Sequence, residues 1–179
     1  VYTDEDKVDD DGNLSGAFEK PEWSPERLRH QMYLGHLSAL RRDLVEEVGG
    51  FRPGFDGSQD HDLALRVTEI ADEVVHIPEV LYHWRMVPGS AAGDPDAKDY
   101  ATDAGMRAVQ DHLKRMGRKD DRVIQSRVAH TYRTERAFDP NTRVSVVIPT
   151  RGTSALVWGE KKPLVVEAVA SLLEHTEHS

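Results

Sequence analysis

The stretch VYTDEDK, residues 1–7, opens the chain with apolar and β-branched residues that run directly into carboxylates. This pattern is typical of a buried strand that ends at a polar edge. Alternate side chains of a strand share one face, so Asp4 and Asp6 are expected to converge on one hard divalent cation. The alternative is a solvated acidic turn. A calcium-binding EF loop is excluded, because it requires acids where Lys7 and Phe18 stand.

The composition fits a globular protein of one domain or one and a half. The chain has 179 residues, 38% of them hydrophobic, which is enough for a packed core. Its net charge is −9, and six acids with one base fall among residues 1–12, so nucleic acid is not an expected partner. The absence of cysteine removes disulfides, thiolate metal sites and cysteine nucleophiles. No stretch reaches the ~20 apolar residues that cross a bilayer.

Helices are predicted where capping residues precede apolar positions at helical spacing. Ser24-Pro25 resembles an N-cap with a first-turn proline, and Gly49-Gly50 tolerates the left-handed conformation that ends a helix. On the helix after Ser58, Asp62 and Arg66 stand four residues apart and are predicted to pair. The predicted helices cover 25–29, 42–48, the residues after Ser58, and 97–116, and the predicted strands cover 33–39, 74–77, 80–84 and 144–148.

A turn at Asp139-Pro140-Asn141 marks the predicted domain boundary. Before it, 123–138 is predicted as an extended linker with some strand character. After it, the near-continuous apolar run 144–148 is typical of a central parallel strand. A polar loop over 150–162 and a helix over 163–175 follow, and together these elements are half of a βαβ unit.

Two further stretches carry residues suited to catalysis. In Gln59-Asp60-His61-Asp62, on a first helical turn, Asp60 can accept a proton from a bound hydroxyl. The alternative is that acids favour helix N-termini through the macrodipole. In Tyr82-His83-Trp84-Arg85, at the end of a strand, His83 suits a metal and Arg85 a phosphate, whereas the alternative is an aromatic strand edge packed on the core.

Taken in order, these stretches resemble the large family of inverting GT-A-fold glycosyltransferases, which use nucleotide-sugar donors. The similarity is greatest to members that build bacterial O-antigen and other surface polysaccharides, including rhamnosyltransferase-like proteins. The resemblance covers about residues 1–117, and Arg143 to Arg151 resembles the beginning of the same fold. Five blocks carry it: Thr3 to Lys7, Phe18 to Trp23 with Ser24-Pro25, Gly49-Gly50-Phe51-Arg52, Gly57 to Leu63, and His83-Trp84-Arg85.

The resemblance implies an α/β fold, namely a partial GT-A (Rossmann-like) fold truncated at its N-terminus. Residues 1–118 would be the half of a domain that holds the metal, the acceptor and the catalytic base. Residues 119–142 would be a linker, and 143–179 would be the first strand and helix of a second domain of the same kind.

The resemblance also implies roles for single residues. Asp4 and Asp6, with His83 as a further ligand, would bind Mg²⁺ or Mn²⁺ on the donor diphosphate. Asp60 would deprotonate the acceptor hydroxyl for an attack that inverts the anomeric carbon. The implied substrate-binding residues are Trp23, Gly50, Phe51, Gln59 and Arg85, and the implied nucleotide-binding residues of the second segment are Thr150 and Arg151.

Two departures from the family pattern bear on these roles. Gln59 stands where many relatives have Glu. The loop 152–162 is longer and less regular than the family pattern, which argues against nucleotide binding by the second segment. A carbohydrate-binding or scaffold domain without turnover therefore stays open as the alternative function. A simple cation-binding module is a more remote one.

The expected partners are a nucleotide-sugar donor and a glycan or lipid-linked acceptor, at a cytoplasmic location that includes the inner face of the membrane. Because the chain starts at Val1 rather than Met, and the nucleobase-binding strands would precede it, we expect a fragment with little activity on its own. The strand over 144–148 and the final helix are equivalents of the elements that the first domain lacks. Homo-oligomers formed by strand–helix complementation are therefore a further expectation.

Overall fold

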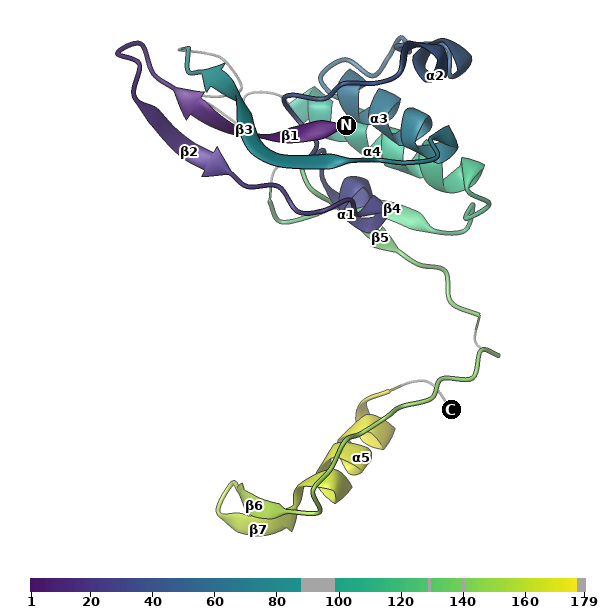
Figure 1. Cartoon of the computed structure of the whole chain (residues 1–179). Coiled ribbons are helices and arrows are strands. Elements are labelled where there is room, and N and C mark those ends of the chain that lie inside the picture. Colours follow the sequence, from purple (N-terminus) through teal and green to yellow (C-terminus); the bar gives the residue numbers. More distant parts are fainter. Residues whose placement is uncertain (88–98, 129, 140, 177–179) are drawn as a thin grey trace. The chain divides into compact units, whose positions relative to one another are not determined.

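The computed structural model describes residues 1–87, 99–128, 130–139 and 141–176. The chain divides into two compact units, Val1–Ala137 and Phe138–Ser179, and each combines helix with small sheets (Figure 1). The α/β class predicted from the sequence is confirmed, whereas the assignment to parts of GT-A domains stays a prediction. None of the helices within the described residues has the length and apolar character that crossing a bilayer requires.

A three-stranded sheet forms the β layer of the first unit. It comprises β1 (Tyr2–Val8), β2 (Leu14–Phe18) and β3 (His76–Arg85), in the order β2-β1-β3. β2 is antiparallel to β1 and β3 is parallel to it, so β1 and β3 end at the same edge of the sheet (Figure 1). The opening stretch of the chain is thus a strand, as its pattern predicts.

β3 is one continuous strand where the sequence predicts two, 74–77 and 80–84. The break predicted at Pro78 is a bulge instead, since Ile77 pairs with Thr3 and Val80 pairs with the next residue, Asp4. Proline cannot donate a ladder hydrogen bond, and a bulge accommodates it without ending the strand.

The strand predicted over 33–39 is wrong. An isolated bridge between Tyr2 and Ser38 joins this segment to β1. The Leu34 and His36 carbonyls accept hydrogen bonds from the buried Lys20 Nζ at 2.7 and 2.6 Å. The Lys20 amine donates to carbonyls that would otherwise accept from the backbone of a neighbouring strand. The segment therefore packs without regular structure.

The helices of the first unit lie where the capping signals predict them. Positions 97 and 98 of the predicted long helix fall outside the described residues. The Ser24 hydroxyl caps its helix by accepting from the Arg27 N–H. Ser58 stands at an N-cap, but its hydroxyl donates to the Ala101 carbonyl at 2.6 Å and so ties two helices together. The helices are α1 (Pro25–His30), α2 (Arg42–Glu47), α3 (Gln59–Ile70) and α4 (Asp99–Arg115).

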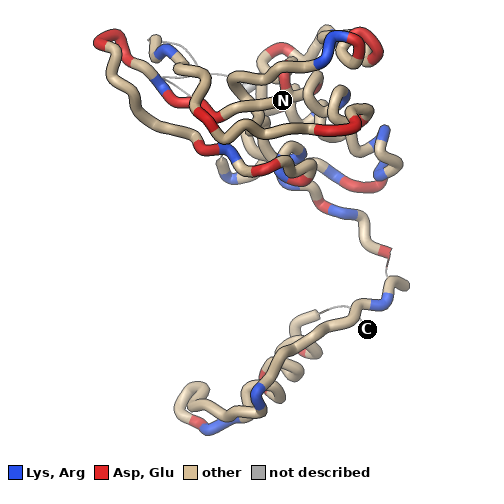
Figure 2. Tube along the Cα trace, viewed as in Figure 1, with Lys and Arg blue, Asp and Glu red and all other residues tan. Residues whose placement is uncertain are grey.

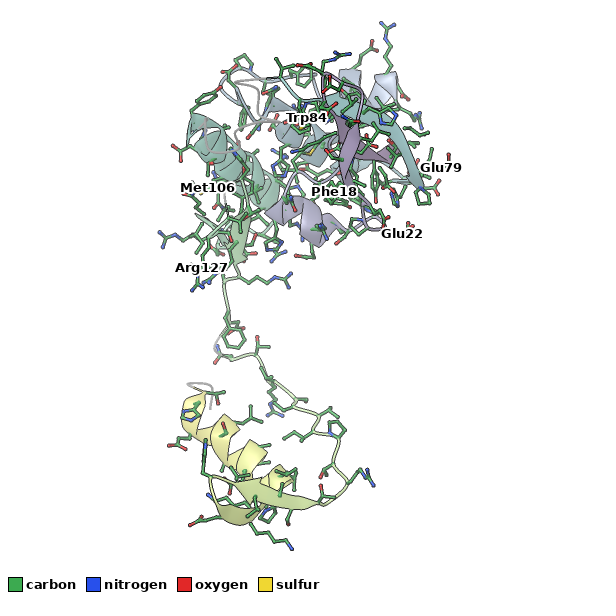
Figure 3. All side chains as sticks on the ribbon, turned by 90° about the vertical axis from the view of Figure 1, so that its left-hand side faces the viewer. Phe18, Glu22, Glu79, Trp84, Met106 and Arg127 are labelled. Carbon is green, nitrogen blue, oxygen red and sulfur yellow. The ribbon has the colours of Figure 1, made fainter. Side chains whose placement is uncertain are left out.

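The core of the first unit lies between the start of β1 and the packed pair α3 and α4. Tyr2, Leu65 and Val109 are almost fully buried in it. Partly buried Phe18 and Met106 pack against this core (Figure 3). Every residue of α3 from His61 to Val67 is buried, so this helix is a rigid support for the side chains at its first turn.

A hairpin of β4 (Arg122–Gln125) and β5 (Tyr132–Glu135) occupies much of the range that the sequence predicts as linker, 119–142. Tyr132 is 3% exposed and belongs to the core of the first unit. One large buried aromatic ring gives this short hairpin the packing that a linker lacks. The strand character predicted within 123–138 is thus confirmed, whereas the segment is a packed element of the first unit rather than an extended linker.

The second unit contains β6 (Ser154–Val157), β7 (Glu160–Pro163) and α5 (Leu164–His175). The helix agrees with the prediction. The polar loop predicted over 150–162 contains the β6–β7 hairpin instead, which turns at Trp158 and Gly159, both with positive φ.

The central strand predicted over 144–148 does not form within the described residues. β6 and β7 pair with each other, and Val147 of the predicted strand is 87% exposed. A central parallel strand needs a neighbour on each side, which this small unit does not supply. Strand–helix complementation, which depends on this strand, stays a prediction.

Candidate functional site

Asp4 and Asp6 lie on the same face of β1 and are nearly buried, with exposures of 4% and 7%. A rise of about 3.3 Å per residue sets the two side chains roughly 7 Å apart along the strand. Glu5 between them points to the other face, where it accepts the His36 N–H at 2.7 Å. Figure 2 shows that acidic residues follow β1 and the turn after it.

Asp4 is engaged inside the protein. Its Oδ1 accepts the Lys20 backbone N–H at 2.9 Å and lies 2.8 Å from His76 Nε2. Burial by itself would raise the pKa of Asp4, but the hydrogen bonds from Lys20 and His76 outweigh burial and lower that pKa. The His76 ring stacks on Tyr2 with 4.7 Å between centroids, which fixes the imidazole. Asp4 is therefore an ionised carboxylate that joins β1 to β3.

Asp6 and His83 come together across the parallel pair of strands. They are register partners, and Asp6 Oδ1 lies 2.5 Å from His83 Nδ1. The Asp6 side chain is 9% exposed, whereas that of His83 is 51% exposed. Arg85, two residues further along β3 and opposite Val8, is exposed. The edge where both strands end thus presents a carboxylate, an imidazole and a guanidinium.

The chemistry of this pair fits a divalent cation. A carboxylate with an imidazole suits a transition-metal ion such as Mn²⁺ better than Mg²⁺, which prefers oxygen ligands. Asp4 fits less well as a direct ligand, because two partners, Lys20 and His76, hold its Oδ1, whereas Asp6 Oδ1 contacts the imidazole with which it would share the ion. In the part of the chain that the structure describes, no group of three or more His, Asp or Glu side chains is arranged to hold a metal ion.

The first turn of α3 separates exposed from buried side chains. Gln59 and Asp60 are exposed, whereas His61 and Asp62 are 1% and 0% exposed. Asp60 Oδ1 accepts the N–H of His61 at 2.8 Å. The Asp60 carboxylate therefore stands at the surface on a turn whose next residues are anchored in the core.

Asp62 joins α3 to the loop that precedes it. Arg66 Nε and Nη2 donate to Asp62 at 2.9 and 2.6 Å, which confirms the predicted pair, and Arg52 Nε donates at 3.1 Å. Burial would raise the pKa of Asp62, but the two arginines lower it. Arg66 also donates to the Val48 and Gly50 carbonyls. This arginine thereby fixes the segment that carries Phe51, whose side chain is 65% exposed.

The remaining predicted residues are dispersed. Trp23 is partly buried against the core of the first unit, so most of its ring is used in packing. Thr150 and Arg151 are exposed residues of the second unit, and Thr150 Oγ1 accepts the Gly152 N–H at 3.0 Å. Their predicted nucleotide binding stays a prediction, as do the roles assigned to Trp23, Gly50 and Phe51.

Sequence reasoning missed Lys20, His76 and Tyr132, which organise the surroundings of the predicted site. Lys20 and His76 hold Asp4, and Tyr132 stacks on His61 with 5.7 Å between ring centroids. A lone lysine, histidine or tyrosine has no spacing signal. Only the fold brings these residues to their partners.

A cavity of about 370 Å³ lies elsewhere in the first unit. Val1 and Tyr2 line it at the start of β1, and Val67, Thr68 and Ala71 line it at the end of α3. None of the predicted site residues lines this cavity, which lies at the opposite end of β1 from Asp6.

Comparison with known proteins finds two long relatives. The chain is 37% identical over 178 residues to the O-antigen biosynthesis protein RfbC of Myxococcus xanthus, a match that covers 99% of this chain and 13% of that protein. It is 42% identical over 153 residues to an uncharacterized protein, y4gI, of Sinorhizobium fredii, covering 84% of this chain and 17% of that protein. No protein-family model matches the chain. The chain thus spans less than a fifth of the length of either relative.

Proposed function

We propose that this protein is a metal-dependent, inverting glycosyltransferase of surface-polysaccharide biosynthesis. It transfers a sugar from a nucleotide-diphosphate donor to a hydroxyl of a glycan or lipid-linked acceptor. The observation that carries the proposal is the Asp6–His83 pair where two parallel strands end, since ligands of open α/β sheets bind outside the carboxyl ends of the strands. The likeness of nearly the whole chain to an O-antigen biosynthesis protein supports the choice of pathway.

The donor diphosphate and its cation are bound by three side chains, those of Asp6, His83 and Arg85. Asp6 and His83 would hold the divalent cation, which when bound neutralises the charge of the leaving diphosphate. The exposed Arg85 binds the diphosphate, because a planar guanidinium matches phosphate oxygens. Asp4 supports this edge from inside, through its contacts to Lys20 and His76.

Asp60 serves the acceptor. It takes the proton of the acceptor hydroxyl as that oxygen bonds to the anomeric carbon and the diphosphate leaves from the opposite side, which inverts the configuration. α3 leads directly into β3. In α/β units a helix runs back along the strand that follows it, so its first turn faces the edge where that strand ends. This architecture supports a base at Asp60 opposite the donor residues.

The test is turnover of sugar nucleotides by the full-length native protein with Mn²⁺ and an oligosaccharide acceptor. NMR of the product reports whether the anomeric configuration is inverted. Asp60→Asn is expected to lower kcat by about a hundredfold while donor affinity is kept, because general-base catalysis contributes at least that much. Asp56→Asn, which changes another exposed acid just before α3, is the matched control and should retain activity.

A carbohydrate-binding or scaffold domain would give a different result. Such a domain would bind glycan without releasing nucleotide, and Asp60→Asn would leave that binding unchanged. Product with retained configuration would also contradict the proposal.

A further inference from the structure

We infer that Tyr132, from the β4–β5 hairpin, is a positioning residue for Asp60. The inference rests on the proposed function, in which Asp60 is the catalytic base. Tyr132 stacks on His61, the neighbour of Asp60, with 5.7 Å between ring centroids and 21° between ring planes. The hairpin therefore contacts the one turn of α3 that bears the proposed base.

His61 connects Tyr132 to the rest of the unit. Its Nε2 lies 2.6 Å from the Leu28 carbonyl, which makes Nε2 the hydrogen-bond donor and anchors the ring to α1. Its backbone N–H donates to the Asp60 carboxylate at 2.8 Å. A displacement of the His61 ring would thus displace the N–H that orients Asp60.

The Tyr132 hydroxyl is enclosed by small residues. Burial raises the pKa of Tyr132, and its hydrogen bond with Ser58 opposes that rise. Ser58, at the N-cap of α3, donates to the Ala101 carbonyl of α4. An added Cβ at Gly105 of α4 would stand 1.8 Å from the Tyr132 hydroxyl oxygen, so glycine leaves the space that this hydroxyl fills.

The first turn of α3 is thus held on three sides, by α1 through His61, by α4 through Ser58, and by β5 through Tyr132. Asp60 and Gln59 remain exposed on this turn. A base must meet its substrate with sub-ångström accuracy, and buried neighbours that lock its backbone supply this accuracy.

The experiment compares three variants of the full-length native protein. Tyr132→Leu removes the ring and the hydroxyl, whereas Tyr132→Phe keeps the ring that stacks on His61. Val123→Ala is the control, because Val123 of β4 packs against the same core and pairs with Thr134 rather than with Tyr132.

Tyr132→Leu is expected to lower kcat about tenfold or more, with donor KM nearly unchanged, since small misplacement of a catalytic group is costly. Tyr132→Phe should restore most of the activity. Equal kcat for Tyr132→Leu and Val123→Ala would overturn the inference.

Hydrogen exchange gives a second measurement that does not depend on turnover. Tyr132→Leu should speed exchange of the amides of residues 61–63, and Val123→Ala should not. Unchanged exchange at these amides would overturn the inference whatever the activity. Faster exchange in a protein that turns over no sugar nucleotide would uphold the role of Tyr132 in holding the turn and would reject the proposed function instead.

Discussion

Asp62 and Arg66 form a buried ion pair one helical turn apart, with 2.6 Å between the closest atoms and side-chain exposures of 0% and 7%. The same guanidinium donates to the Val48 and Gly50 carbonyls, at 2.7 and 2.6 Å. One arginine thereby satisfies a buried carboxylate and two backbone acceptors. Arg66 consequently holds the loop before α3 and the helix itself together as one rigid segment next to the proposed base, Asp60.

Asp62→Asn is expected to destabilise the first unit by about 3–5 kcal/mol, because removing one member of a buried pair leaves the other charge uncompensated. Urea unfolding measures this loss. The control is Glu46→Gln, which breaks the Arg42–Glu46 pair, also four residues apart but with side-chain exposures of 90% and 63%. An exposed pair contributes little, so the control should unfold like the parent protein. Equal losses of unfolding free energy in Asp62→Asn and Glu46→Gln would show that burial does not decide how much an ion pair contributes to stability.

Stability is expected to fall as the pH drops below about 6.5, the ordinary pKa of histidine. Burial lowers the pKa of His61 in the folded protein, although its hydrogen bond to the Leu28 carbonyl opposes this. The unfolded chain therefore takes up a proton at a higher pH than the folded chain does. The stability that His61 contributes is fully present above the pKa of histidine in the unfolded chain. It is lost as the pH falls toward the lower pKa of His61 in the folded protein.

The measurement is the free energy of unfolding between about pH 7 and pH 5. His61→Gln should reduce its slope against pH. His175→Gln alters an exposed histidine of the second unit and should leave the slope unchanged. An unaltered slope in the His61 variant would show that other groups account for the acid sensitivity.

The helices could be predicted because each carries its own local signals, such as Ser24-Pro25 before α1 and Gly49-Gly50 after α2. The spacing of four between Asp62 and Arg66 likewise predicted their contact. Strand pairing depends on partners distant in sequence. The apolar run 144–148 reads as a central strand, yet no neighbour pairs with it in the described structure.

The candidate site likewise combines residues that carry a signal in the sequence with residues that only the fold brings together. The family resemblance implies Asp6 and His83, from separate motifs, as ligands of one metal, and the structure brings the two side chains into contact across 77 positions of sequence. Asp4 belongs to the same predicted set, but Lys20 and His76 occupy its carboxylate, and neither has a sequence signal. Tyr132 was hidden in a segment that resembles linker.

Gly105→Ala is expected to destabilise the protein, against the usual effect of this substitution. Replacing glycine by alanine within a helix normally stabilises by about 1 kcal/mol. Here the new Cβ would stand 1.8 Å from the Tyr132 hydroxyl oxygen, and overpacking of this kind costs about 1–3 kcal/mol. A double-mutant cycle with Tyr132→Ala tests the cause. In the Tyr132→Ala background the same substitution should become stabilising, and a loss that persists there would exclude Tyr132 as the cause.

Metal binding is expected to depend unequally on the two aspartates of β1. Asp6→Asn and His83→Gln should each weaken Mn²⁺ binding by about tenfold or more, measured by calorimetry on the full-length native protein. Asp4→Asn should weaken it less and lower the unfolding midpoint more, since Asp4 bonds to Lys20 and His76 within the protein. Asp10→Asn, in the exposed turn after β1, is the control for loss of charge alone. The reverse order, with Asp4→Asn abolishing Mn²⁺ binding and Asp6→Asn leaving it intact, would show that Asp4 is the ligand and that the Asp6–His83 contact serves only to hold β1 and β3 together.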